Sequence, residues 1–272
     1  MSETEQQTIV EGESYVATMA VDDLEELVDA IRPIESVVYL DFDHDHLEVR
    51  ARDFVNVYAT RVRKPIDAPH ATVATVKSTE LIEAVDAIRW ADDDVRLELD
   101  DDLWIFDGDE NRRTFQEVER EPTDGVRDRP EFDDLLEWVE WNVRATCDAW
   151  QFAGAVRTVA EPASVAVRVS AEDFGVRVEG DGREFDDEAG EMAQIWPYFD
   201  RFDADVETAC ADADDATCVV SEDYARTVAD AVPVSGDSRI EIRFGHDQPL
   251  YVESESGVEV VIAPRITGDD DE

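Results

Sequence analysis

One pattern occurs twice in the chain, as KSTELIEAVDAIRWADDDVRLEL at residues 77–99 and as VVSEDYARTVADAVPVSGDSRIEIRF at residues 219–244. In each copy a serine, Ser78 or Ser221, comes before the apolar pattern, and serine is favoured at a helix N-cap. Apolar residues then recur three or four positions apart, which predicts a short amphipathic helix, and a turn leads into an alternating strand. Internal repetition indicates a duplicated unit, so we expect two similar halves.

Strands and short helices continue outward from both copies. A helix is predicted after Asp22 or Asp23, either of which serves as its N-cap, and Pro33 stops it. Another is predicted to open at Asp148. The apolar stripe of the first consists of Leu24, Leu27, Val28 and Ile31, and that of the second of Phe152, Val156 and Val159. Alternating residues predict strands at 37–42, 46–51, 55–62, 95–99, 103–108, 111–120, 138–147, 165–170, 175–180, 239–244, 249–254 and 258–264.

A segment with little apolar periodicity separates the halves. It contains Pro122, Gly125 and Pro130, which are typical of a linker. We expect a flexible N-terminal arm at 1–14, one domain at 15–116, a connector at 117–137, a second domain at 138–267 and an acidic tail at 268–272. The second half has an additional segment with the string WPYFDRF, whose aromatic residues we expect to pack locally.

The charge of the chain is extreme. Its 70 acidic and 24 basic residues give a formal net charge of −46, and only Lys64 and Lys77 are lysines. Acidic residues occupy every segment, so the fold repels itself at low salt. In molar salt the Debye length is about 3 Å, which screens that repulsion. The composition therefore indicates the cytoplasm of a halophile, and global acidity of this kind does not exclude a nucleic-acid partner.

The cysteines and the hydropathy restrict the compartment. Cys147, Cys210 and Cys218 are odd in number and form no C-x-x-C pair, so we expect neither a disulfide framework nor a zinc site. The N-terminus has no basic region followed by an apolar run, and no 18 apolar residues are consecutive. We expect a cytoplasmic protein that neither crosses a membrane nor is secreted.

Three strings, together with the order of elements from Tyr15 to Ile266, resemble the PCNA family of sliding clamps. LEVRARDFVNVYATRV is similar to a first-domain segment of that family, with Asp53, Asn56 and Val57 at the matching positions. PLYVE, which starts at Pro249, resembles the strand before the C-terminal one. VVIAPRI at 260–266 resembles the C-terminal strand and its ending.

The resemblance implies an α+β fold, the DNA clamp fold, with two topologically similar domains, outer antiparallel sheets and four inner helices. It further implies a homotrimeric ring of haloarchaeal or haloviral type, placed on DNA by a clamp loader. Such a ring encircles double-stranded DNA and tethers DNA polymerase and other replication and repair proteins, and it is not an enzyme. The alternative is a clamp-fold paralogue that acts as a protein-binding or regulatory module without encircling DNA.

Two sets of residues follow from the resemblance. The DNA-facing residues are Arg32, Lys77, Arg89, Arg157 and Arg226. The pocket for partner peptides consists of Val57, Phe132, Leu135, Pro249, Ala263, Pro264 and Ile266, and the alternative for each is ordinary sheet core. Two departures stand out: the first helix is acidic where most clamps have basic residues, and Val261 stands where the family often has tyrosine.

Catalysis has little support in the sequence. No nucleophile elbow, P-loop, dinucleotide fingerprint or zinc-protease motif occurs. The string DFDHDH has His44 and His46 at alternate positions, which on a strand would share one face and could suggest a metal site. A hairpin turn explains the same polar residues, so we expect no metal, no cofactor and no catalytic residue. A metal-dependent hydrolase using both histidines is the remaining enzyme hypothesis.

Overall fold

The structure is a computed structural model, and the residues it describes lie between 15 and 265. The described ranges are 15–34, 36–53, 57–88, 94–107, 114–120, 136, 139–160, 166–186, 191–209, 216–232 and 238–265. The predicted arm and acidic tail lie outside these ranges, as does most of the predicted connector. The proposed domain boundaries therefore stay a prediction.

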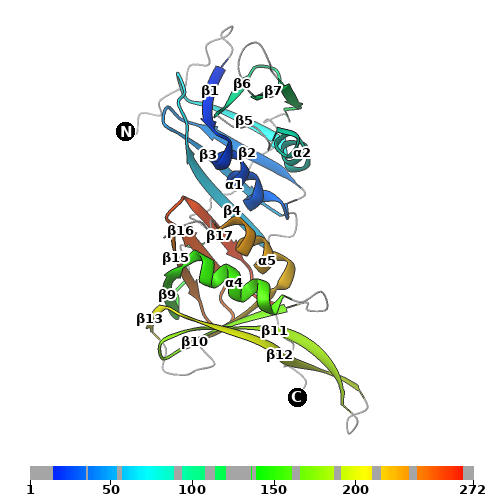
Figure 1. The fold of residues 1–272 in the computed structure, drawn as a ribbon, viewed down its shortest axis with the longest axis vertical. Coiled ribbons are helices and arrows are strands. Elements are labelled where there is room, and N and C mark those ends of the chain that lie inside the picture. The colour runs from blue at the N-terminus through cyan, green and yellow to red at the C-terminus, as the bar shows by residue number, and fades with distance from the viewer. Residues whose placement is uncertain are drawn as a thin grey trace, which may run out of the picture.

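Four short helices lie within the described ranges, and they form one row along the long axis of the molecule (Figure 1). Helix α1 packs against both α2 and α5, and α5 packs against α4. Their bounds are Val21–Ile31 for α1, Ser78–Ile88 for α2, Ala149–Val159 for α4 and Glu222–Ala231 for α5. The predicted apolar stripes of α1 and α4 are buried, because residues three or four apart share one helix face.

The strands form three antiparallel sheets. The first has the order β1-β6-β7-β8, the second β12-β11-β10-β14 and the third β13-β9-β15-β16-β17-β4-β3-β2-β5. The first comprises β1 (Tyr15–Ala20), β6 (Asp94–Leu99), β7 (Leu103–Asp107) and β8 (Thr114–Val118). The second comprises β10 (Ala166–Glu172), β11 (Gly175–Asp186), β12 (Glu191–Asp203) and β14 (Thr217–Ser221).

The third sheet has nine strands and joins the two halves of the chain. They are β2 (Val37–Phe42), β3 (His46–Arg52), β4 (Tyr58–Pro65), β5 (Thr72–Lys77), β9 (Val143–Asp148), β13 (Asp205–Thr208), β15 (Arg239–Phe244), β16 (Leu250–Ser254) and β17 (Val258–Ile262). The junction is the β4–β17 pair, in which Tyr58 opposes Ile262 and Val62 opposes Val258. One apolar core runs through both halves and includes the fully buried Phe42 and Phe152.

The helix starts differ in part from the prediction. Helix α1 begins at Val21 with Ala20 as its N-cap, so the predicted cap at Asp22 or Asp23 is wrong. Both aspartates lie in the first turn instead, where carboxylates stabilise the positive end of the helix dipole. Asp148 and Ser221 occupy the N-cap positions of α4 and α5, as predicted, but make no side-chain capping hydrogen bond.

Ser78 connects two segments instead of capping α2. It is the first residue of the helix and is fully buried. Its hydroxyl donates to the Ile34 carbonyl oxygen and accepts the Ser36 backbone N–H at 3.2 Å. A buried hydroxyl needs such partners, so the serine fixes the chain after α1 against the start of α2.

The strand predicted at 138–147 begins later than expected. Strand β9 starts at Val143, because Trp141 leaves the alternation and packs against Tyr251, with ring centroids 5.9 Å apart. The additional segment of the second half forms the long β11–β12 hairpin, which projects from the lower end of the molecule (Figure 1). Phe202 of this hairpin is buried as expected, whereas Tyr198 and Phe199 are exposed.

Candidate nucleic-acid interface and partner pocket

The row of helices carries a strongly acidic surface. The four helices hold eleven Asp and Glu residues and two arginines, Arg157 and Arg226. All the acidic residues belong to α1, α2 and α5, and α4 has none. On α4 the exposed positions include Trp150, Arg157 and Thr158. A duplex approaching this row would therefore meet the least repulsion at α4.

Arg32 lies at the C-cap of α1 and bridges to α2. Its Nη2 and Nη1 atoms donate to the two carboxylate oxygens of Asp86 at 2.7 and 3.1 Å, and its Nε atom donates to Asp29 at 2.7 Å. The hydrogen bonds to Asp86 and then to Asp29 raise the pKa of the Arg32 guanidinium above its ordinary value. The guanidinium is thus held in a bidentate pair, although about two fifths of its side chain is exposed.

Three further predicted DNA-facing residues also lie at the helix row and have carboxylate partners, namely Lys77, Arg157 and Arg226. Arg157 on α4 donates to Asp230 on α5 through Nε at 3.0 Å and Nη2 at 2.8 Å. Lys77 pairs with Glu80 at 3.0 Å. Arg226 pairs through Nε with Glu222 at 2.8 Å. Arg89 lies outside the described residues. Four of the basic residues that the resemblance predicted therefore lie on the helix row. The sequence alone did not show that each of them pairs with an acidic neighbour.

Four of the predicted pocket residues lie together at one end of strands β4, β16 and β17. Leu250 pairs with Ile262, which brings Pro249 opposite Ala263 in the register. The Ala263 N–H donates to the Val57 carbonyl oxygen at 2.7 Å, and Pro264 follows directly. All four predicted pocket residues that are described are half-buried. Phe132, Leu135 and Ile266 lie outside the described residues, so the pocket assignment stays a prediction.

A small apolar cluster adjoins these residues and was missed by the sequence reasoning. It consists of Ala59, Tyr251 and Val261, with Leu136 and Trp141 packed against it. The sequence feature that could have predicted this cluster is the position of Tyr251, two residues after Pro249 on an alternating strand. The Tyr251 hydroxyl donates toward Glu253 at 3.0 Å and Glu259 at 2.9 Å, and burial raises the pKa of this phenol. An aromatic side chain thus lies beside Val261, where the family often has tyrosine.

Asp53, one of the residues that carried the resemblance, has a structural role between the halves. Its Oδ1 atom accepts the backbone N–H groups of Val57 at 2.7 Å and Tyr58 at 3.0 Å, and its Oδ2 atom accepts the Tyr224 hydroxyl at 2.6 Å. The Tyr58 and Tyr224 rings stack with centroids 5.3 Å apart. Burial, followed by the hydrogen bond to Asp53, raises the pKa of Tyr224 to about 12. The carboxylate joins the start of β4 to α5.

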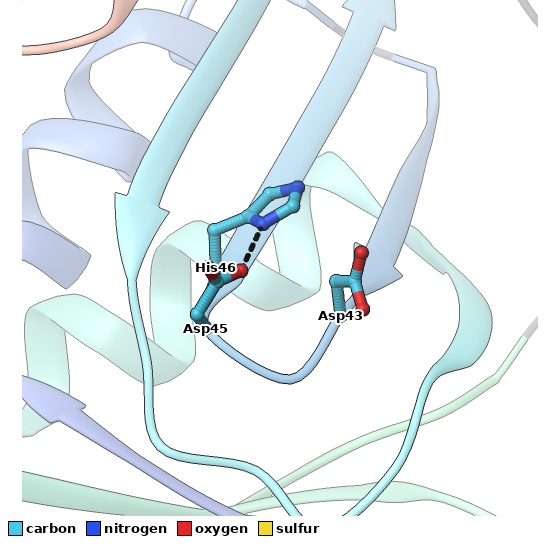
Figure 2. Close-up of side chains that lie close together, drawn as sticks. All are labelled: Asp43, Asp45 and His46. Atoms are coloured by element: carbon cyan, nitrogen blue, oxygen red, sulfur yellow. Dashed lines mark hydrogen bonds and ion pairs between the residues drawn. The ribbon is translucent and has the colours of Figure 1, made fainter.

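The DFDHDH string forms a hairpin turn, and three of its side chains lie close together. Asp43, Asp45 and His46 have ligand atoms within 4.8 Å of one another, and His46 Nδ1 lies 2.7 Å from Asp45 Oδ1 (Figure 2). The hydrogen bond from His46 lowers the pKa of the exposed Asp45. The predicted hairpin turn is confirmed, because β2 ends at Phe42 and β3 starts at His46, so the two histidines do not share one strand face. His44 lies in the turn between them.

Comparison with known proteins shows the fold. No family model matches the chain, and no curated protein matches it. Among solved structures, PCNA from Thermococcus kodakaraensis matches with a TM-score of 0.66 and 14% identity over 93% of this chain and 100% of that one. PCNA from Entamoeba histolytica matches with a TM-score of 0.66 and 12% identity over 92% and 98%. A structure of the C-terminal region of FEN-1 bound to A. fulgidus PCNA matches with a TM-score of 0.68 and 20% identity over 93% and 98%.

The predicted α+β fold is therefore confirmed, since helices in one row and antiparallel sheets are the arrangement of a DNA clamp. More narrowly, the fold is that of the PCNA sliding clamps. None of the helices in the described ranges is long and apolar enough to cross a membrane.

Proposed function

We propose that this chain is the subunit of a sliding clamp, a DNA polymerase processivity factor that works as a homotrimeric ring around double-stranded DNA. The observation that carries the proposal is the single row α2-α1-α5-α4 of helices in contact, which would line part of the central hole. Such a ring works by topology: it retains its partners near the template by raising their effective concentration. It makes and breaks no bond, so we propose no enzymatic activity.

Two sheet edges at opposite ends of the molecule support ring closure. Within the described sheets, β8 is the last strand of the first sheet and β12 is the last strand of the second. The sheet with β6 and β7 lies at one end of the long axis, and the sheet with β11 and β12 lies at the other (Figure 1). An edge strand presents unpaired backbone groups that another chain can pair with. Head-to-tail pairing of β8 with β12 of the next copy makes a heterologous contact, which closes when the rotation fits.

Encirclement predicts that binding depends on DNA ends. Preassembled rings should thread onto a linear duplex in molar KCl and should be excluded when both ends carry bulky biotin–streptavidin blocks. Retention on free-ended duplex should exceed retention on blocked duplex by about tenfold or more, because surface attraction is weak at this salt concentration. Size-exclusion chromatography with labelled duplex measures it. Equal retention on both substrates, or on neither, would favour the clamp-fold paralogue that does not encircle DNA.

We further propose that the pocket around Val57, Pro249, Ala263 and Pro264 binds partner peptides, with DNA polymerase as one source. The solved structure of the FEN-1 C-terminal region on A. fulgidus PCNA supports a protein partner for this fold. A short helix with apolar and aromatic anchors suits such a site. A clamp loader would place the ring on DNA, and the cytoplasm of a halophile, haloarchaeal or haloviral in origin, fits the charge.

Peptide binding should depend on the half-buried Ala263. In Ala263→Asp, a carboxylate at this half-buried position would lose hydration when a peptide covers it, so a polymerase C-terminal peptide should bind about 1 to 3 kcal/mol more weakly. Isothermal titration calorimetry in molar KCl measures the difference. Ala209→Asp is the matched control, because Ala209 is exposed and also donates its backbone N–H, to the Asn142 carbonyl oxygen at 2.8 Å. Equal affinities for both variants would remove the pocket assignment.

A further inference from the structure

Two ion pairs between neighbouring helices occupy corresponding places in the two halves. Arg32, at the end of α1, pairs with Asp86 on α2, and Arg157, in the last turn of α4, pairs with Asp230 on α5. Asp86 and Asp230 are each the ninth residue of their helix. The two halves therefore share an arginine at the end of one helix and an aspartate near the end of the next.

Both pairs use the donors that would otherwise bind phosphate. A guanidinium recognises phosphate through two parallel N–H groups, the same geometry that it uses for a carboxylate. In Arg32 the Nη1 and Nη2 atoms donate to Asp86 and the Nε atom to Asp29. In Arg157 the Nε and Nη2 atoms donate to Asp230, and Nη2 also donates to the Ala229 carbonyl oxygen at 2.7 Å. Each aspartate thus occupies the position of a phosphate group.

The pairs are open to exchange because they are exposed. The side chains of Arg32, Asp86, Arg157 and Asp230 are 39% to 55% exposed. Exposed ion pairs typically contribute between about 0 and 1 kcal/mol, so exchange of the aspartate for a phosphate has a small intrinsic cost. The buried carboxylate pairs of this chain differ: Glu48, with 3% of its side chain exposed, binds Arg50 and Arg63. The two pairs on the helix row are exposed enough for exchange with a ligand, whereas the pairs of Glu48 are not.

We infer that Asp86 and Asp230 are intramolecular competitors of DNA phosphate, which hold Arg32 and Arg157 and so keep the attraction of the ring for duplex low. This inference rests on the proposed function. A clamp has to slide, and arginines that pass between aspartate and phosphate give weak, position-independent contacts. The acidic helix row therefore still has basic residues that can bind phosphate. Their aspartate partners determine how often these arginines are free to bind DNA.

The test is a comparison of charge-matched variants. Asp86→Asn with Asp230→Asn removes the interhelical carboxylate partner of each arginine and two negative charges per chain, while Arg32 keeps Asp29 and Arg157 keeps the Ala229 carbonyl oxygen. Glu83→Gln with Asp223→Asn removes the same charge from the same two helices, at exposed positions that are not among the described partners of Arg32 and Arg157. Binding of a 40-base-pair duplex is followed by fluorescence anisotropy at several KCl concentrations, with light scattering to verify the ring.

The first variant should bind duplex about three- to tenfold more tightly than the control variant, with a steeper dependence of log affinity on log salt, because each new phosphate contact adds to that slope. Adding Arg32→Gln and Arg157→Gln should remove the gain. An equal rise in both variants would show that net charge alone matters, and no rise in an assembled ring would show that the pairs only join helices. If the unmodified ring still threads onto free DNA ends, either result overturns the inference about the aspartates and leaves the proposed clamp function standing. If no variant binds or threads, the proposed function falls as well.

Discussion

The chain should unfold cooperatively when salt is removed. Its net charge of −46 is spread over both halves, and in dilute buffer the Debye length of about 30 Å at 0.01 M leaves most of that repulsion unscreened. In about 3 M KCl the same charges are screened and apolar burial dominates. We expect native far-UV circular dichroism in molar KCl and loss of the cooperative thermal transition in dilute buffer, with the midpoint rising by tens of degrees between these conditions.

The control separates screening from general stabilisation by solutes. Sucrose strengthens apolar burial by exclusion from the protein surface, but it does not screen charge. Sucrose in dilute buffer should therefore restore much less of the thermal midpoint than KCl does. A thermal midpoint that is the same at 0.1 M and about 3 M KCl would contradict the electrostatic explanation. If sucrose restored the midpoint as well as KCl does, exclusion of the solute from the protein surface would explain the effect instead.

Ring assembly should be lost when a charge is placed on the β12 edge. Phe199 on this strand is 61% exposed in the single chain, and the Arg177 guanidinium lies 4.5 Å from its ring centroid. If β12 meets β8 of the next copy, Phe199 becomes buried, and full burial of such a side chain contributes about 1.5 to 3 kcal/mol. Phe199→Asp removes this contribution from apolar burial. It also adds a carboxylate that must be desolvated at each of the three contacts between subunits. We expect a shift from trimer to monomer.

Light scattering in molar KCl measures the molar mass, and Phe174→Asp is the matched control. Phe174 is 77% exposed and lies in the turn between β10 and β11, five residues before Glu179, which is the register partner of Phe199. Like Phe199→Asp, the Phe174→Asp variant replaces an exposed phenylalanine ring by a negative charge. A trimer that survives Phe199→Asp, or two variants that dissociate equally, would remove this edge from the proposed interface.

Local patterns were sufficient to predict most of the elements. Leu24, Leu27, Val28 and Ile31 recur with the period of a helix, and all four are buried on α1. Alternation predicted β2 and β3 with bounds that match within one residue. Among the elements that were predicted, the errors are at ends, as at Ala20 and Trp141, because one residue of strand or helix changes the local pattern very little. Strands β1, β5, β12, β13 and β14 were not predicted.

The order of elements, the duplicated helix-and-strand unit and the acidity of every segment were thus determined by the sequence itself, since they depend on neighbours a few positions apart. Tertiary structure alone decided which polar side chains distant in the sequence meet. Arg32 and Asp86 are 54 positions apart, Asp53 and Tyr224 are 171 apart, and Arg61 and Glu259 are 198 apart. With 70 carboxylates in the chain, no spacing rule selects the partner of an arginine. The register of β4 against β17 and the packing of α1 on α2 make that selection, because they alone set which side chains lie within hydrogen-bonding distance.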